Sequence, residues 1–187
     1  MRILLPFVVG LLALPAQTHA AEVVPTPAFR SVDLRGGGDV TIVRGPVQRV
    51  TILSGSSAFT RIYVEREGQL RIDACNSRCP RNYPLQIRIE SPTVPAVAIE
   101  GGGTIVAAPG FAPQGDVAAA VHAGGTIDLR AVDAIEVSAA VNAGGTIYVR
   151  PRSRLSAAVN AGGDIRYSGN PQVSMAVANG GNVSRSN

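Results

Sequence analysis

The two cysteines are the first residues of this chain whose type and spacing suggest chemistry. Cys75 and Cys79 stand in the run CNSRC, with three residues between them. A redox CxxC motif has two intervening residues, and a zinc site would need two further ligands, whereas His122 is the one histidine beyond residue 20. We therefore predict a structural disulfide, rather than a redox or metal pair, that closes a short loop and stabilises the fold by about 2 kcal/mol.

The carboxylates offer little for catalysis. Glycosidases need two of them about 5–10 Å apart, but the positions equivalent to Asp128 in the neighbouring repeats hold Val, Tyr and Arg. Asp133 and Glu136 have no acidic equivalents in those repeats, and one histidine does not support a Ser-His-Asp set. We expect no catalytic residue, cofactor or metal. A polysaccharide lyase or hydrolase built on a β-helix is the alternative.

Two columns of outward-facing residues are the candidates for binding. One column is polar, and its residues change from acid to amide along the repeats. It could bind a glycan or an ion. Alternatively, the asparagines are there because they adopt the corner conformation and stack their amides between repeats. The other is a strip of methyl groups that could contact a protein, a second copy or a sugar ring, or could simply fill the outer face. The candidate binding residues are His122, Asn142, Asn160, Ala120, Ala140 and Ala158.

A repeated sequence motif must position these residues. It reads GGGTI, AGGTI, AGGTI, AGGDI and NGGNV, and the residues that follow its glycine pairs are spaced by 22, 20, 18 and 18 positions. A period near 20 is typical of stacked repeats. The paired glycines, which we expect to be structural, are Gly102, Gly103, Gly124, Gly125, Gly144, Gly145, Gly162, Gly163, Gly180 and Gly181.

Apolar residues recur two apart on both sides of each glycine pair. The columns nearest the pairs start at Ile99 and Ile105, and each continues with Val or Ile in the later repeats. A step of two predicts two strands joined at a corner, with side chains alternating inside and outside. Glycine allows the positive φ of a sharp corner, and stacked corners about 4.8 Å apart should leave no room for a side chain at either glycine.

These patterns predict an all-β, single-domain parallel β-helix with an irregular, partly antiparallel N-terminal half. Right-handed crossovers are the usual case, although an 18-residue repeat is also three of the hexapeptides found in left-handed β-helices. Residues 1–20 read as a signal peptide, 21–28 as a flexible arm, 29–94 as the irregular part and 95–187 as the regular repeats.

The N-terminal half contains one early copy of the glycine motif. FRSVDLRGGGDVTIV at 29–43 has apolar residues around its glycines as the later repeats do. The alternating stretches 61–65 and 69–73 predict a hairpin, and 85–90 predicts a further strand.

Charge and composition limit the partners. All 17 basic residues are arginine, and the net charge of +4 falls to +3 without Arg2. These arginines alternate with apolar residues, as expected for solvated strand faces rather than a nucleic-acid site. We expect an exported protein of the periplasm or extracellular space, with no nucleic-acid partner and no transmembrane anchor.

The same motifs resemble the head GIN domain family of auto-transporter adhesin-like exported bacterial domains. The resemblance lies in FRSVDLRGGGDVTIV, GQLRI, LQIRIESPTVPAVAIEGGGTIV and the later glycine turns, over most of residues 29–184. It implies an exported β-helical domain of the bacterial envelope with no established catalytic residues. The chain departs from that pattern in its CNSRC loop and in having no downstream auto-transporter barrel. We expect a non-enzymatic binding or structural protein with an envelope protein or glycan as partner, and a homo-oligomer through the alanine face as an option.

Overall fold

The computed structural model describes residues 21–76 and 78–186, and within them the chain forms strands and no helix. The predicted signal peptide at 1–20 lies outside the described residues. The strands are β1 Glu22–Val24, β2 Ser31–Arg35, β3 Asp39–Arg44, β4 Arg49–Ser54, β5 Arg61–Val64, β6 Gln69–Asp73, β7 Gln86–Ser91, β8 Ala96–Glu100, β9 Thr104–Ala107, β10 Gln114–Val121, β11 Thr126–Asp128, β12 Ala134–Ala143, β13 Thr146–Val149, β14 Pro151–Ala161, β15 Asp164–Tyr167, β16 Gln172–Val177 and β17 Asn182–Arg185.

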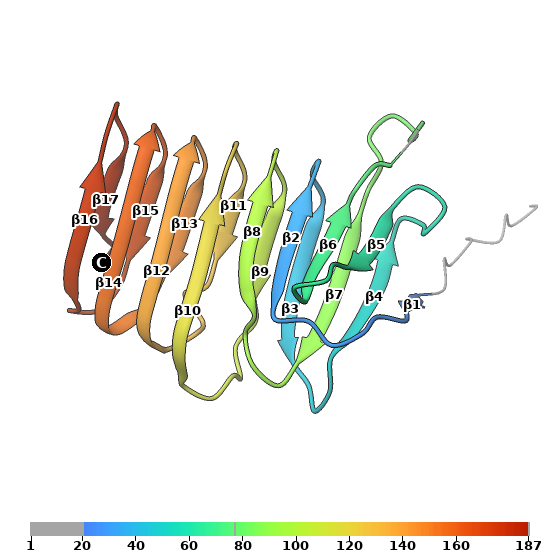
Figure 1. Ribbon diagram of the computed structural model, residues 1–187, viewed down its shortest axis with the longest axis horizontal. Helices are drawn as coiled ribbons and strands as arrows, with labels where there is room; N and C mark the ends of the chain where they lie inside the picture. Colours follow the sequence, from blue (N-terminus) through green and yellow to red (C-terminus); the bar gives the residue numbers. More distant parts are fainter. Residues whose placement is uncertain (1–20, 77, 187) are drawn as a thin grey trace, which may run out of the picture.

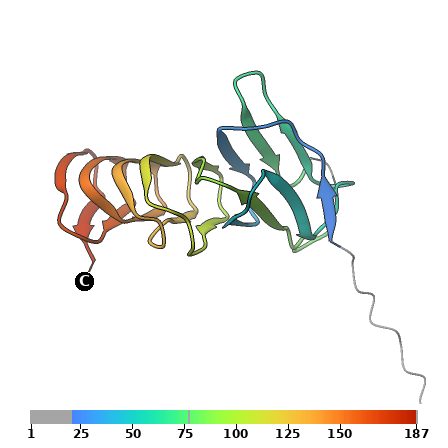
Figure 2. The same ribbon diagram turned by 90° about the horizontal axis from the view of Figure 1, so that it is seen from below.

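The strands form two mixed sheets that face each other (Figures 1 and 2). One sheet has nine strands in the order β1-β4-β7-β3-β9-β11-β13-β15-β17. The other has eight, in the order β16-β14-β12-β10-β8-β2-β6-β5. From β8 onward the chain alternates between the sheets, so each repeat contributes one strand to each. The predicted all-β class is confirmed.

Neighbouring repeats pair in parallel and in the register that the glycines predict. Thr126 is paired with Thr104 on one side and with Thr146 on the other. In the second sheet Val141 is paired with Val121 and Val159. The two predicted inner columns face each other between the sheets, and their members up to the fourth repeat are at most 1% exposed: Ile99, Val121, Val141, Val159, Ile105, Ile127, Ile147 and Ile165.

The two glycines of a corner have different roles, which corrects one expectation. Gly144 and Gly145 both have positive φ, +73° and +99°. A Cβ on Gly145 would lie 2.6 Å from Val121 Cγ1 and 2.8 Å from the carbonyl oxygen of Gly125. A Cβ on Gly144 would have no atom of the described residues within 4 Å. Because the first glycine points away from the stack, only the second lies against the preceding repeat.

The early copy of the glycine motif stacks directly on the regular repeats. Leu34 in β2 is paired with Ile99 in β8, and Val40 in β3 with Ile105 in β9. In the sequence, residues 45–94 are therefore inserted between two segments that are neighbouring layers of the stack. The predicted equivalence of these two segments is confirmed.

A further repeat lacks the glycine pair, and the sequence pattern missed it. β6 runs parallel to β2, and β7 runs parallel to β3, so together they add one more layer to both sheets. The connection between them contains the predicted disulfide, which joins Cys75 and Cys79. This loop therefore stands where the other repeats have glycines.

Antiparallel strands complete the N-terminal end, as predicted. The hairpin of β5 and β6 pairs Tyr63 with Arg71, and β4 lies antiparallel to β7. The segment predicted as a flexible arm is partly a strand instead, because β1 pairs with the edge of β4 through Val23 and Thr51. The free edge of β4 offers hydrogen bonds that the β-branched residues of this segment can use.

The asymmetry of the corner leads to a matched test. We expect Gly144→Ala to reduce the free energy of unfolding by about 1–2 kcal/mol, because only the positive φ is strained. Gly145→Ala should reduce the free energy of unfolding by about 2–5 kcal/mol, since its methyl group would also collide with Val121 and with the Gly125 carbonyl. Urea denaturation of the two variants measures the difference. Equal losses would contradict the close packing at the second glycine.

Candidate functional site

The predicted alanine column forms a continuous strip on the outer face of the eight-stranded sheet. Ala120 is paired with Ala98 and Ala140, and Ala140 is paired with Ala158. Their partly exposed side chains alternate with buried ones along each strand. The structure therefore brings Ala120, Ala140 and Ala158 together, on the side of the sheet that the alternation predicts.

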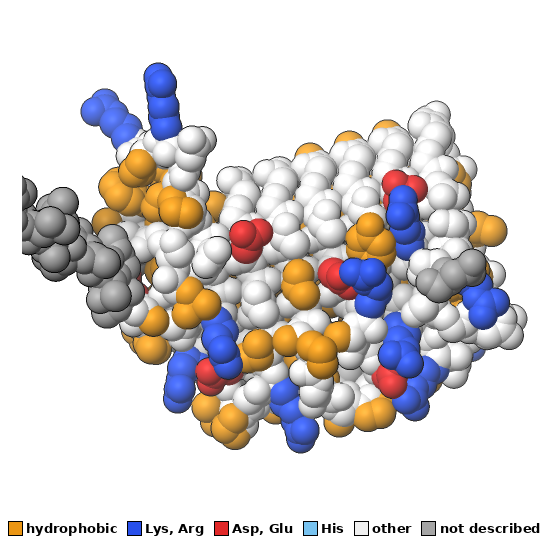
Figure 3. All heavy atoms as spheres, turned by 180° about the vertical axis from the view of Figure 1, so that it is seen from behind, with side chains coloured by type: hydrophobic (Ala, Val, Ile, Leu, Met, Phe, Trp, Pro, Cys, Tyr) orange, Lys and Arg blue, Asp and Glu red, His pale blue; other side chains and the backbone are white. Residues whose placement is uncertain are grey.

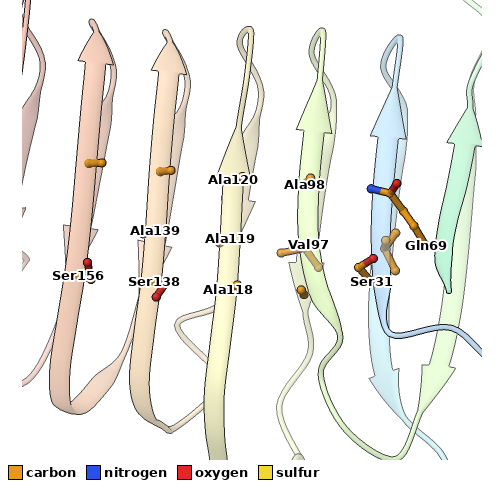
Figure 4. Close-up of a pocket in the computed structure, with 14 residues that line it drawn as sticks. Ser31, Gln69, Val97, Ala98, Ala118, Ala119, Ala120, Ser138, Ala139 and Ser156 are labelled. Atoms are coloured by element: carbon orange, nitrogen blue, oxygen red, sulfur yellow. The ribbon is translucent and has the colours of Figure 1, made fainter. Parts of the chain in front are cut away.

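A second column of small residues lies beside the first, and sequence reasoning missed it. Ala118, Ser138 and Ser156 are in register, two positions before the alanines (Figure 4). The same period of two that identified the alanines would have found them. The two columns form the floor of a hollow of about 410 Å³ that reaches from β14 past Ser31 in β2 to Gln69 in β6.

The three predicted polar residues form a hydrogen-bonded ladder along one side of this floor. Asn160 Nδ2 donates to Asn142 Oδ1 at 3.1 Å, and Asn142 Nδ2 lies 2.9 Å from His122 Nδ1. Because the amide nitrogen is a donor, His122 Nδ1 accepts, and the neutral ring carries its proton on Nε2. The asparagines therefore stack between repeats, and the ladder is exposed to solvent.

A second polar column lies along the opposite side of the floor. Asp116, Glu136 and Arg154 are in register, so the expectation that Glu136 has no acidic equivalent in the neighbouring repeats is wrong. Arg154 Nη1 donates to Glu136 Oε1 at 2.6 Å. Small side chains therefore form a low strip between two higher polar margins. This shape follows from the register alone, because each margin lies one outward position further along every strand.

A charged cluster lies at the N-terminal end of the strip. Asp33 takes the place in β2 that Ala98 takes in β8, and it is 1% exposed. Arg35 Nε donates to Asp33 Oδ2 at 2.8 Å, and its Nη2 donates to Glu100 Oε1 at 2.8 Å. The hydrogen bond from Arg35 to Asp33 raises the pKa of Arg35. Arg71 lies on the other side, 3.8 Å from the same carboxylate oxygen.

Several acidic residues on and around the nine-stranded sheet, Asp128 and Asp133 among them, are paired with arginine (Figure 3). Arg130 hydrogen-bonds to Asp128 and so lowers the pKa of that carboxyl, while desolvation opposes the shift. Arg152 and Arg150 lower the pKa of Asp133 in the same way. A general acid needs a raised pKa, so neither carboxyl is suited to that role.

An aromatic side chain accompanies these pairs. The guanidinium carbon of Arg130 lies 4.6 Å from the ring centre of Tyr148, and that of Arg166 lies 5.8 Å from it. As predicted, the positions beside Asp128 hold Val106 and Tyr148 and no second acid. The described residues contain no group of three or more His, Cys, Asp or Glu side chains that could hold a metal ion.

The chain matches one family model twice. Its description is "Putative auto-transporter adhesin, head GIN domain", and it matches residues 28–112 and residues 97–171. Together the matches span residues 28–171, which include the early repeat and most of the regular ones. No helix among the described residues is long and apolar enough to be a candidate membrane span.

Three bacterial proteins are among the solved structures to which the chain is similar. A "putative adhesin" of Bacteroides fragilis is 19% identical, with a TM-score of 0.49, over 91% of this chain and 98% of that one. A "putative adhesin" of Parabacteroides merdae is 12% identical, with a TM-score of 0.38, over 90% and 96% of the two chains. A "putative lipid binding protein" of Parabacteroides distasonis is 15% identical, with a TM-score of 0.39, over 89% and 96%. Comparison with curated proteins gives no match.

The ion pair of Asp128 has a consequence for acid stability. A lowered pKa in the folded state adds stability above the unfolded value of about 3.9, and that stability is lost as the pH falls through the folded value. We expect Asp128→Asn to lower the melting temperature at pH 7 and to lose this effect near pH 2.

The matched control is Asp116→Asn, since Asp116 is exposed and forms no ion pair with any described residue. It should melt like the natural protein throughout this pH range. A Tm difference for Asp128→Asn that stays constant from pH 7 to pH 2 would contradict the role assigned to Arg130.

Proposed function

The chain belongs to the head GIN domain family of "putative auto-transporter adhesins", and from this membership we propose that it is an exported, non-enzymatic binding protein. Its partner is a protein or glycan of the cell envelope. The contact surface is the strip of small residues on the eight-stranded sheet, with its two polar margins. Adhesion enters this proposal through the family description alone.

The proposed architecture is a right-handed β-solenoid of one domain. Residues 29–94 form its irregular part and residues 95–187 its regular coils, after a leader at 1–20 and an N-terminal segment at 21–28. Parallel pairing of successive repeats in both sheets supports this architecture, and the handedness rests on the usual crossover rule.

Export to the periplasm or extracellular space is the second part of the proposal. The apolar run and small-residue cleavage site of residues 1–20 support it. The disulfide between Cys75 and Cys79 supports it independently, because such bonds persist mainly in oxidising compartments.

The shape of the strip is the observation that carries the binding role. Alanine and serine have little rotamer freedom to lose, so a ligand that lies on them orders few side chains. Outer polar atoms of His122 and Asn160 on one margin, and the Glu136–Arg154 pair on the other, can then hydrogen-bond to the ligand's edges. A flat ligand with polar edges, such as a glycan chain or a protein strand, fits this arrangement.

The alternative, a carbohydrate-active enzyme, lacks support from the carboxylates. Asp128 and Asp133 have lowered pKa values and arginine partners. Asp116 and Glu136 are neighbours in register, but the carboxylate of Glu136 accepts a hydrogen bond from Arg154. Release of reducing sugars from envelope polysaccharides by the purified protein would favour the enzyme.

A glycan array and a pull-down from envelope extract, both with the mature protein, test the binding role. Ala140→Arg places a long charged side chain on the strip, and we expect it to weaken any binding at least tenfold. The control is Thr41→Arg, which adds the same side chain to an exposed position of the opposite sheet and should bind normally. Equal effects of the two variants would show that the strip is not the contact surface.

A further inference from the structure

The C-terminal end of the stack leaves both sheets open. β16 is the last strand of the eight-stranded sheet and β17 the last strand of the nine-stranded sheet, and they belong to the same repeat (Figure 1). Among the strands of the described residues, each has a partner on one side only, β14 for β16 and β15 for β17. Two rows of backbone N–H and C=O groups therefore face outward at one end of the molecule.

The apolar columns are also open at this end. Met175 and Val177 are 63% and 46% exposed, whereas Ala157 and Val159, one repeat earlier in the same columns, are 4% and 1% exposed. At every earlier step the next repeat covers these positions. The surface that would bury Met175 and Val177 is therefore another layer of the same kind: two strands about 10 Å apart with apolar residues between them.

The edge of β16 has none of the features that usually block strand pairing. Its sequence, QVSMAV, has no charge and no proline. The last repeat from Ser168 onward carries one charged residue, Arg185. Natural edge strands generally carry lysine, proline or a bulge to prevent such pairing, so this edge is suited to it.

We propose that this end is an interface between two copies of the chain, which meet tail to tail about a two-fold axis. A two-fold axis across the end reverses the direction of the partner strands, so both edges are extended by antiparallel pairs. An unrelated extended peptide could pair with one edge only and would leave the apolar columns partly open. A second copy offers both edges and the matching columns at once.

The other end of the molecule does not offer the same surface. Its outermost strands are β1, with three residues, and β5, with four, and each belongs to an antiparallel pair. A tail-to-tail contact therefore closes on itself as a dimer, whereas a head-to-tail contact would continue into a filament. This proposal is independent of the ligand strip, which lies on the face of the sheet and not at its end.

Sedimentation velocity of the mature protein over a hundredfold range of concentration tests the proposal. We expect a monomer–dimer equilibrium, with no larger species. Met175→Lys should shift the protein to monomer, because it places a charge between the two copies, while the melting temperature of the monomer should change little at a position that is 63% exposed. Ile135→Lys, at another exposed apolar position (50%) away from the end, is the matched control and should still dimerise.

Hydrogen exchange locates the interface. In the dimer, amides of residues 172–185 should exchange at least tenfold more slowly than in the Met175→Lys variant. A natural protein that stays monomeric at the highest concentration would overturn the proposal. So would a dimer that persists in Met175→Lys but dissociates in Ala140→Arg, because that result would place the contact on the alanine face. A series of growing oligomers would also overturn it.

Discussion

The close contact at the second glycine of each corner is the constraint on which the rest of the structure depends. At Gly145 a single added carbon would collide with a backbone carbonyl and a valine of the preceding repeat. Gly163 is confined in the same way, and Gly125 slightly less. This close packing at the second glycine fixes the position and the strand register of each repeat relative to the preceding one. The parallel pairing of both strands then follows without a helix or a large aromatic core to guide it.

Fixed register has consequences on both sides of each sheet. On the inside, it aligns Val and Ile into columns that pack against each other and exclude water. On the outside, it repeats every side chain at the strand spacing of about 4.8 Å, so that alanines become a strip and asparagines become a ladder. The binding surface and the open end are thus products of the same repetition. The binding surface is formed by the outer sheet faces of the repeats, and the open end is formed by the last repeat.

The regular half could be predicted from the sequence because its signal is periodic. The glycine pairs, the inner columns, the alanine strip and the stacking of the early copy at residues 29–43 all follow from spacing. The layer formed by β6 and β7 could not, because a disulfide loop replaces the glycines and removes the marker. The different roles of Gly144 and Gly145 were also hidden, since both have positive φ and only three-dimensional contacts separate them. Sequence reasoning identified the polar candidates but missed the serines beside the alanines, although the same period of two places them on the outer face.

Nuclear Overhauser effects between methyl groups of successive repeats test the stacking of the repeats most directly. In protein labelled only at isoleucine δ1 methyl groups, nuclear Overhauser contacts should connect Ile105 to Ile127, Ile127 to Ile147 and Ile147 to Ile165, because each is paired with the next. Contacts between non-adjacent members of this series should be absent. A spectrum without the sequential contacts, or with Ile105 in contact with Ile165, would contradict the stacking of repeats on the glycine corners.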